Sequence, residues 1–324
     1  MPFDSQISRS NAAALIPEAV AEEIQLSLED NFWLFQLARR LPNLTRAQQR
    51  VPVASALAEA YFVTGDTGLK QTTELSWENK YIDAEEVAAI VVIPEAVLAD
   101  ADYDIWAEVR PALEAAFSKL ITQAVLYGTN IPASWTTNLG AAGLVTFATN
   151  AGHTASVAGF SDLYEAILGE SAEGAGDGLL MLLEADGFMA SGHVAHTSMR
   201  GRLRNCRDAD GQPIFTRAPQ EASRYELDGE PCFFPRDVSI DASQALLISG
   251  DWSQLVYAMR QDMTFSTNNQ GVITDMASNI TYNLFQQDMV ALRAVMRLGF
   301  ALPNPINQME ETEASRSPFA VLTA

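Results

Sequence analysis

The sequence predicts an α+β fold of one elaborate domain or two interleaved ones, as expected for 324 residues. Three observations predict it: a hairpin pattern between residues 50 and 94, a helical repeat of apolar residues between 102 and 127, and strand-rich segments between 245 and 303. No internal repeat is present in the sequence. The chain therefore combines one long helix with several strands.

The composition indicates a folded and strongly acidic protein. Hydrophobic residues make up 48% and charged residues 19% of the chain, which suits a large buried core. The formal net charge is −21, from 41 acidic and 20 basic residues. Proteins that bind nucleic acid need clustered Lys and Arg to release counterions from phosphate. We therefore expect no sequence-specific or packaging-type binding of nucleic acid.

Signals for export or membrane insertion are absent from the sequence. Cys206 and Cys232 are too few for a secreted disulfide framework, and both are expected to be buried or idle thiols. Residues 1–20 lack a basic start followed by a long apolar core, and no segment reaches the about 18 apolar residues of a membrane span. These features predict a cytoplasmic location and no membrane partner.

Residues 17–41 predict an amphipathic helical arm that Pro17 can begin. Its apolar residues recur at helical spacing, at positions Val20, Ile24, Leu28, Phe32, Phe35 and Leu37. A single helix cannot bury such a face alone. The arm therefore needs a second surface, in its own domain or on a neighbouring subunit.

Residues 50–94 predict a long β-hairpin. Strand-favouring residues flank a polar break with Gly65, Asp66 and Gly68, which tolerate tight turns. Two arms of about ten residues extend over about 30 Å at about 3.3 Å per residue. Because a two-stranded ribbon is marginally stable alone, we expect it to lie on a partner.

Residues 102–127 predict the longest helix, about 38 Å long at about 1.5 Å per residue. Asp102 or Asp104 can cap its start, and Gly128 suits the left-handed position after its last turn. Pro111 removes one amide donor, so we expect it to bend or break the first turns.

The remaining chain is expected to mix short helices and strands. Helices are expected at 161–168, with Ser161 as a cap, and at 197–207, followed by a turn at 208–211 and a strand at 212–216. The residues after Pro303 are polar and are expected to form a tail.

Sequence motifs for catalysis, metals and cofactors are missing: there is no Walker loop, G-x-S-x-G or C-x-x-C. His193 and His196 have the spacing H-x-x-H, but no nearby Cys or Asp pattern completes a zinc site. Both are expected to be hydrogen-bonded polar residues. The sequence thus predicts a protein that is not an enzyme and has no cofactor.

Arginines are concentrated between residues 200 and 224, at Arg200, Arg202, Arg204, Arg207, Arg217 and Arg224. Two interpretations stay open. The arginines form a solvated helix face, or they contact an acidic face of a sister subunit, since complementary charge sets register in assembly.

Several segments, in their order along the chain, resemble the Hong Kong 97-type major capsid proteins of tailed bacteriophages. They are VVIPEAVLADADYDIWAEVRPALEAAFSKLITQAVLYGTN, TSMRGRLRNCRDADGQPIF, GEPCFFPRDVS, ALLISGDWSQLVYAMRQDMTFS and NLFQQDMVALRAVMRLGFALPNP. The resemblance spans residues 10 to 305, and the order of the segments is its specific signal.

This resemblance implies a division of the chain into four parts. They are an N-terminal arm at 1–49, an extended loop at 50–93, a peripheral domain at 94–145 and 286–324 with the spine helix 102–127, and an axial domain at 146–285. It also implies pentamers and hexamers that build an icosahedral head around double-stranded DNA. The implied partners are further copies of the chain and scaffolding, portal and decoration proteins. The implied location is the virion, after assembly in the host cytoplasm.

The resemblance also suggests which residues contact neighbouring subunits. The candidates are Trp33, Phe35, Lys70, Trp77, Lys80, Arg200, Arg204 and Arg207. Some members of the family join a loop lysine to a neighbour's asparagine, with a carboxylate assisting. Lys70, Asn283 and Asp288 are the candidates here, although the returning segment lacks a Glu for this chemistry.

Three alternatives remain at the level of the sequence. An encapsulin-type nanocompartment shell would share the fold but enclose a cargo enzyme. A soluble acidic enzyme would be a monomer with a deep polar pocket. A phage tail-tube protein is disfavoured by the long helix.

Overall fold

The computed structural model describes most of the chain after residue 31. The described residues are 32–63, 68–70, 72–100, 105–160, 162–169, 177–206, 212, 225–236, 239–274 and 280–324. Several expected features lie outside them. These are most of the arm helix, the turn of the loop at 64–67, the caps Asp102 and Asp104, the cap Ser161, the turn at 208–211 and the strand that follows it.

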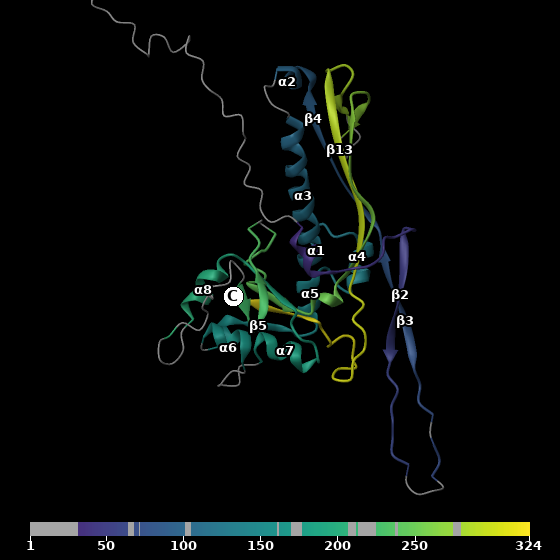
Figure 1. The fold of residues 1–324 in the computed structure, drawn as a ribbon, viewed down its shortest axis with the longest axis vertical. Coiled ribbons are helices and arrows are strands. Elements are labelled where there is room, and N and C mark those ends of the chain that lie inside the picture. Colours follow the sequence, from purple (N-terminus) through teal and green to yellow (C-terminus); the bar gives the residue numbers. More distant parts are fainter. Residues whose placement is uncertain are drawn as a thin grey trace, which may run out of the picture.

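A four-stranded sheet and one long helix form the elongated upper part of the molecule in Figure 1. The strand order is β1 (Arg39–Arg40), β10 (Val256–Asn268), β13 (Met289–Ala301) and β4 (Glu85–Pro94). β13 runs antiparallel to both β10 and β4. Helix α3 (Ile105–Tyr127) runs alongside, and its Leu113 and Phe117 share one core with Leu292 and Ala294 of β13.

Helix α3 confirms the long helix predicted over residues 102–127. Of the expected bend or break at Pro111, the break does not occur, because the helix continues through this residue. A proline this close to a helix start removes one donor and leaves the later turns intact. Gly128 follows the last turn with φ 70°, as predicted. A Cβ at this position would lie 2.4 Å from the carbonyl oxygen of Ala142, so the backbone at Gly128 lies too close to the backbone at Ala142 to leave room for a side chain.

A six-stranded sheet forms the second half of the molecule. Its order is β5 (Thr154–Ser156), β14 (Phe319–Thr323), β9 (Leu247–Gly250), β6 (Gly192–Ala195), β8 (Glu230–Phe233) and β7 (Tyr225–Leu227). Helices α6 (Leu163–Leu168), α7 (Leu179–Ala185) and α8 (Met199–Asn205) share a core with these strands. α6 is capped by Asp162, whose carboxylate accepts the amide of Glu165 at 3.0 Å.

The end of the chain is a strand and not the expected polar tail. β14 pairs in parallel with β5 and antiparallel with β9, and Phe319 is fully buried. The prediction failed because the residues before Phe319 are polar, although a stretch of five apolar or small residues is long enough for a central strand. β14 therefore belongs to the six-stranded sheet, although the expected peripheral domain included residues 286–324.

Two further strands depart from the expected division. β4 was placed at the end of the extended loop, but it pairs with β13 along its whole length. β10 was placed in the axial segment, but it also pairs with β13, from Val256 to Asn268. Sequence patterns identify strands and do not identify their partners, so these boundaries could not be read from the sequence.

The predicted hairpin is formed by β2 (Gln48–Ala56) and β3 (Ser76–Asp83), which pair antiparallel. The described residues between them, within 57–75, contain no strand. The hairpin and its connecting segment project away from both sheets, toward the bottom right of Figure 1.

Shorter elements connect these parts. They are α1 (Trp33–Leu37), α2 (Glu95–Asp100), α4 (Ala133–Leu139), α5 (Leu144–Asn150), the 3-10 turns η2 (Val157–Gly159) and η3 (Trp252–Gln254), and a small hairpin of β11 (Val272–Thr274) and β12 (Ile280–Asn283). Trp135 of α4 donates from Nε1 to the Asp83 carbonyl at 3.2 Å and lies edge-on to Phe300. α4 thus joins the end of β3 to β13.

Candidate assembly surfaces

The segment between β2 and β3, together with β3, exposes an unusual number of large apolar side chains. Phe62 is fully exposed and Leu69 is 91% exposed. We call this set the loop surface; its members are Tyr61, Phe62, Val63, Leu69, Leu75, Trp77 and Tyr81. Contiguous apolar patches on a soluble protein mark interaction sites.

The base of the hairpin is fixed to the rest of the subunit. Ile82 of β3 is fully buried in a small core with Val256 and Ala301. Lys80 Nζ lies 2.6 Å from Glu313 Oε1 and 3.8 Å from Glu78 Oε1. The hairpin is therefore held at its base, and the segment between β2 and β3, which contains Phe62 and Leu69, projects away from the body (Figure 1).

Trp33 and Phe35 contact their own subunit. Trp33 is 2% exposed and lies edge-on to Trp252 at 6.4 Å. The ring of Phe35 stacks on Phe300 at 5.9 Å and contacts Tyr257 at 4.8 Å. Trp33 has no surface left for a neighbour, so the expected inter-subunit role is wrong for this residue. The two rings instead anchor the end of the arm.

The arginine cluster lies on α8. Arg202 and Arg204 are exposed, while Arg200 is half-buried with its guanidinium 5.7 Å from the ring of Phe234. Arg204 Nε donates to the Arg200 carbonyl at 3.1 Å. Arg207 lies outside the described residues. Part of this cluster is thus engaged within the subunit, and Arg202 contributes an exposed charge.

The cross-link candidates lie at opposite ends of the subunit. Lys70 is exposed in the segment that joins β2 to β3. Asn283 Nδ2 donates to Gln286 Oε1 at 2.7 Å, and the Asp288 carbonyl accepts the Glu95 amide at 2.8 Å beside α2. Figure 1 places α2 at the top and the loop at the bottom, so any bond between them joins two copies.

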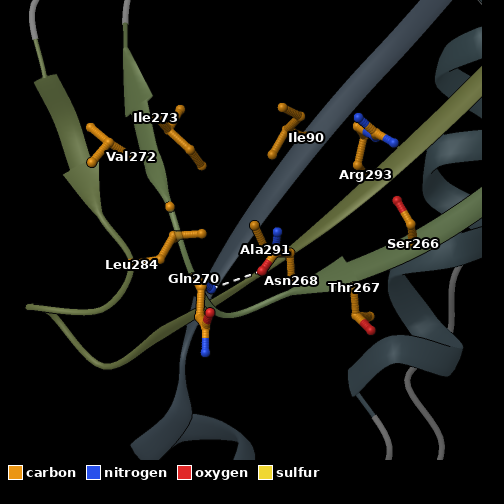
Figure 2. Close-up of a pocket in the computed structure, with 11 residues that line it drawn as sticks. Ile90, Ser266, Thr267, Asn268, Gln270, Val272, Ile273, Leu284, Ala291 and Arg293 are labelled. Atoms are coloured by element: carbon orange, nitrogen blue, oxygen red, sulfur yellow. Dashed lines mark hydrogen bonds between the residues drawn. The ribbon is translucent and has the colours of Figure 1, made fainter.

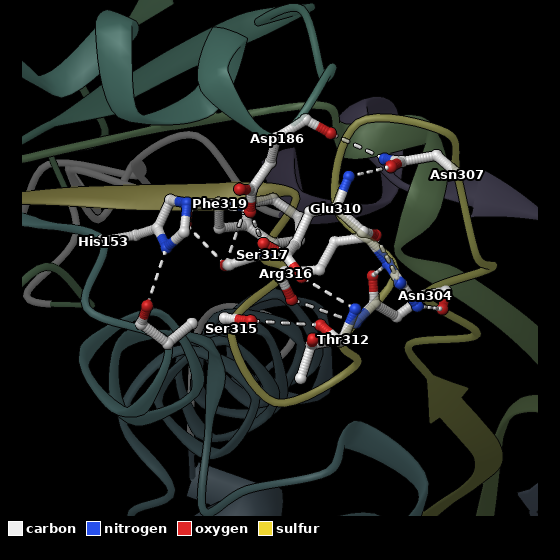
Figure 3. Close-up of polar contacts among 11 residues, drawn as sticks. His153, Asp186, Asn304, Asn307, Glu310, Thr312, Ser315, Arg316, Ser317 and Phe319 are labelled. Carbon is white, nitrogen blue, oxygen red and sulfur yellow. Dashed lines mark hydrogen bonds and ion pairs between the residues drawn. The ribbon is translucent and has the colours of Figure 1, made fainter.

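A buried polar network fixes the segment before β14 (Figure 3). His153 Nε2 lies 2.9 Å from Asp186 Oδ2, and the same oxygen accepts the Ser317 amide at 2.8 Å. Arg316 donates to the carbonyls of Asn304 at 2.9 Å and Glu310 at 2.8 Å. Burial lowers the pKa of Arg316. These bonds satisfy buried backbone groups, so the network is structural.

His193 and Cys232 are also explained by packing. His193 is fully buried, with Nδ1 2.7 Å from Ser249 Oγ and Nε2 3.0 Å from the Leu227 carbonyl. Burial lowers the pKa of His193 to about 4. Burial also raises the pKa of the Cys232 thiol to about 12. In the described part of the chain, no three His, Cys, Asp or Glu side chains are grouped to hold a metal ion.

Membrane insertion finds no support in the helices. None of those in the described segments is long and apolar enough to cross a bilayer.

Sequence reasoning missed the most exposed residues of the loop. Phe62 was taken as part of the first strand of the hairpin, and Leu69 as part of its polar break. The structure shows both side chains exposed. Their signal is apolar side chains beside a Gly-containing turn, where solvent exposure is the default. Trp77 and Lys80 were named, and the structure places both on β3, with Trp77 69% exposed.

Comparison with known families identifies the chain over most of its length. A model of the phage capsid family matches residues 12–306. The major capsid protein of Staphylococcus phage 80alpha is 23% identical over 242 residues, which cover 74% of this chain and 67% of that protein.

Solved structures show the same architecture. A structure from Microbacterium phage Oxtober96 has a TM-score of 0.80 and 30% identity, covering 98% of this chain and 99% of that one. One from Mycobacterium phage Adephagia has a TM-score of 0.79 and 26% identity, covering 98% of both chains. The capsid of a native GTA particle, 17% identical over 99% of this chain and 100% of that one, shares the fold with a TM-score of 0.66. The chain therefore belongs to the phage capsid family, as a major capsid protein of a tailed bacteriophage.

Proposed function

We propose that copies of this chain form the pentamers and hexamers of an icosahedral head that encloses double-stranded DNA. The loop surface carries this proposal. Phe62 and Leu69 expose nearly their whole side chains on a projecting hairpin, and burial of such side chains stabilises association by about 1.5–3 kcal/mol each. Many weak, repeated contacts of this kind close a symmetric shell.

The proposal includes the Hong Kong 97-type organisation of arm, extended loop, spine helix, peripheral domain and axial domain. We assign α3 with the four-stranded sheet, including β10, to the peripheral part. We assign the six-stranded sheet, including β14, to the axial part, and β2, β3 and the segment between them to the extended loop. The axial parts would meet around the five- and six-fold axes.

The acidic charge of the subunit supports a capsid wall that binds the enclosed DNA only weakly. With a net charge of −21, the subunit gains little from counterion release on DNA. Filter binding of the purified subunit to duplex DNA at low salt should show weak retention, and tight binding would contradict this part of the proposal. Scaffolding, portal and decoration proteins are the further partners we propose, with assembly in the host cytoplasm.

Two residue sets remain proposals for contacts between copies. Substituting Arg200 and Arg204 with Glu should weaken oligomers in sedimentation, and unchanged oligomers would remove this set. For the pair of Lys70 with Asn283, assisted by Asp288, particles boiled in detergent would show ladders on a gel. Monomer alone would exclude the cross-link.

A phage head is favoured over a nanocompartment shell, because the reported relatives are phage and GTA capsids. The contents of purified particles separate the two: nuclease-protected DNA supports the head, and an enclosed protein cargo contradicts it.

Sedimentation and negative-stain microscopy of the purified chain test the proposal. We expect pentamers, hexamers or closed particles of uniform size. A monomer at every concentration, with and without the other head proteins of its phage, would overturn it.

A further inference from the structure

We propose that the segment between β13 and β14 is a strap through which the six-stranded sheet sets the direction of the projecting hairpin. The strap consists of residues 302–318 and is the yellow loop between α7 and β2 in Figure 1. It contacts the hairpin on one side and the end of α7 on the other. Asp186, which follows α7, is a positioning residue that acts on the hairpin through the strap.

The base of the hairpin is its first support, and this support belongs to the four-stranded sheet. Ile82 of β3 is fully buried in one small core with Val256 of β10 and Ala301 of β13. Beside it, the carbonyl of Asp83 accepts the indole N–H of Trp135 at 3.2 Å. A two-stranded ribbon is only marginally stable alone, so one support at its base leaves its direction open.

The strap supplies a second support, further from the base. On β2, the Ala54 carbonyl accepts the amide of Ile306 at 3.3 Å. On β3, Lys80 Nζ lies 2.6 Å from Glu313 Oε1. Ala54 pairs with Trp77, which lies further toward the tip of the hairpin than Lys80. The strap thus holds both strands, and a ribbon that is held at two separated points has a defined direction.

Buried hydrogen bonds make the strap rigid (Figure 3). Arg316 is 2% exposed, and its guanidinium donates to the carbonyls of Asn304 at 2.9 Å and Glu310 at 2.8 Å. Asn304 Nδ2 donates in return to the Arg316 carbonyl at 3.1 Å. The side-chain oxygen of Asn307 accepts the amides of Met309 and Glu310. Because hydrogen bonds from a charged donor are strong, these contacts join both ends of the strap into one unit.

Asp186 fixes this unit to the six-stranded sheet. Its carboxylate accepts the Ser317 amide at 2.8 Å, and its carbonyl accepts Asn307 Nδ2 at 2.6 Å. The same carboxylate lies 2.9 Å from Nε2 of His153, the residue before β5. Asp186 is only 7% exposed and is therefore held in place itself. The strap consequently follows the position of the six-stranded sheet.

The two supports of the hairpin belong to different sheets. The base follows the four-stranded sheet and the strap follows the six-stranded sheet, so a movement of one sheet relative to the other turns the hairpin. Hydrogen-bond networks and rigid segments carry coupling of this kind between distant sites. In a shell, the direction of the loop surface would then depend on the six-stranded sheet of its own subunit. This consequence rests on the proposed function, whereas the coupling is a property of the single subunit.

Distances between spin labels, measured by double electron–electron resonance, test the coupling. In a Cys206→Ser background, Leu75→Cys next to β3 and Lys119→Cys on α3 form the hairpin pair, since both native side chains are exposed. Lys119→Cys with Ile90→Cys forms the body pair. Ile90 is 51% exposed on β4, in the wall of a pocket at the far end of the sheet (Figure 2). Cys232 is buried and stays unlabelled.

Two variants disconnect the strap from α7. Asp186→Ala removes the acceptor of the Ser317 amide. Asn307→Asp removes the donor to the Asp186 carbonyl and keeps the side-chain oxygen. Each should broaden the distance distribution of the hairpin pair about twofold or more and leave the body pair unchanged. An excess of unlabelled wild type keeps the measured distances within one subunit.

Ser249→Ala is the matched control. It removes a buried hydrogen bond of 2.7 Å to His193 within the six-stranded sheet and no hydrogen bond to the strap. Both label pairs should keep the distances of the wild type. Broadening of the hairpin pair in this control would show general loosening and would overturn the coupling.

Thermal unfolding establishes which variants fold. Should Asp186→Ala not fold, Asn307→Asp decides alone, because Asn307 is only half-buried. Unchanged hairpin distances in the folded variants, or equal broadening of both pairs, would overturn the coupling and leave the proposed shell function standing. Conversely, a wild type that forms no oligomer but shows the expected broadening would overturn the shell function and leave the coupling standing.

Discussion

Lys80 of β3 and Glu313, in the segment before β14, form an ion pair of 2.6 Å across 233 residues of sequence. The pair joins the projecting hairpin to the far end of the chain. Because β14 is fixed in the six-stranded sheet, the ion pair restricts the angle at which the hairpin leaves the body. A surface ion pair adds little stability, so we expect this pair to act mainly by orienting the loop.

We predict that Lys80→Met and Glu313→Gln each change the free energy of unfolding by less than about 1 kcal/mol, and that the double variant shows coupling of the same small size. Urea denaturation measures this. Assembly should be impaired more than stability, since the loop loses its orientation. A loss above about 3 kcal/mol would mean that the pair is structural, contrary to this account.

The loop surface should matter for assembly and not for folding. Phe62→Ser and Leu69→Ser remove side chains that touch almost nothing in their own subunit, so thermal stability should stay within about 0.5 kcal/mol of the wild type. Particle yield in sedimentation should fall sharply. Met189→Ser, equally exposed but away from the loop, is the control. Normal assembly of both loop variants would remove the loop from the interface.

Substitution by Ala should change the stability in opposite directions at Gly299, which is tightly packed, and at Gly201, which is open. A Cβ at Gly299 of β13 would lie 2.4 Å from the Asp83 carbonyl oxygen and 2.7 Å from Ile82 Cγ2. Gly299→Ala should therefore destabilise the subunit by about 1–3 kcal/mol. Gly201 lies within α8 with nothing in the way, so Gly201→Ala should stabilise it by about 0.5–1 kcal/mol. Equal effects in thermal denaturation would show that the close contact of β13 with β3 is absent.

His193 should make stability depend on pH. Burial lowers its pKa in the folded state to about 4, from an ordinary value of 6.5, so the unfolded chain binds the proton more readily. The stability that this group contributes is complete above about pH 6.5 and is lost as the pH falls toward 4. The loss approaches about 3 kcal/mol.

His193→Gln isolates this contribution from the many carboxylates. The difference in unfolding free energy between wild type and variant should shrink as the pH is lowered from 7 to 4. A difference that is constant over this range would show that His193 is accessible to protons in the folded state.

The sequence pattern within a single segment was enough to predict α3 and the hairpin of β2 and β3. The apolar spacing from Trp106 to Tyr127 and the exit at Gly128 identified α3, because a helix face buried on one side repeats every three or four residues. The hairpin was found in the same way, since β-branched residues flank a break with Gly65 and Gly68. Both signals are contained in the segment that forms the element.

Long-range pairing was not predictable. β3 and β4 follow one another in the sequence but belong to different sheets, because β3 pairs with β2 and β4 pairs with β13. β14 was predicted to be a tail because the residues around Arg316 are polar. They are nevertheless buried, because they bond to Asp186 and Asn304, which are distant in sequence. Trp33 was predicted to contact a neighbouring subunit because the sequence does not show whether an aromatic side chain packs in its own core or against another subunit.

The central claim is that the projecting hairpin finds its apolar partner on another copy of the chain. A cryo-electron microscopy map of the assembled particle tests it most directly. The account predicts a closed shell in which Phe62 and Leu69 are buried against a neighbouring subunit. A shell with both side chains in solvent, or a hairpin folded back onto its own subunit, would contradict it.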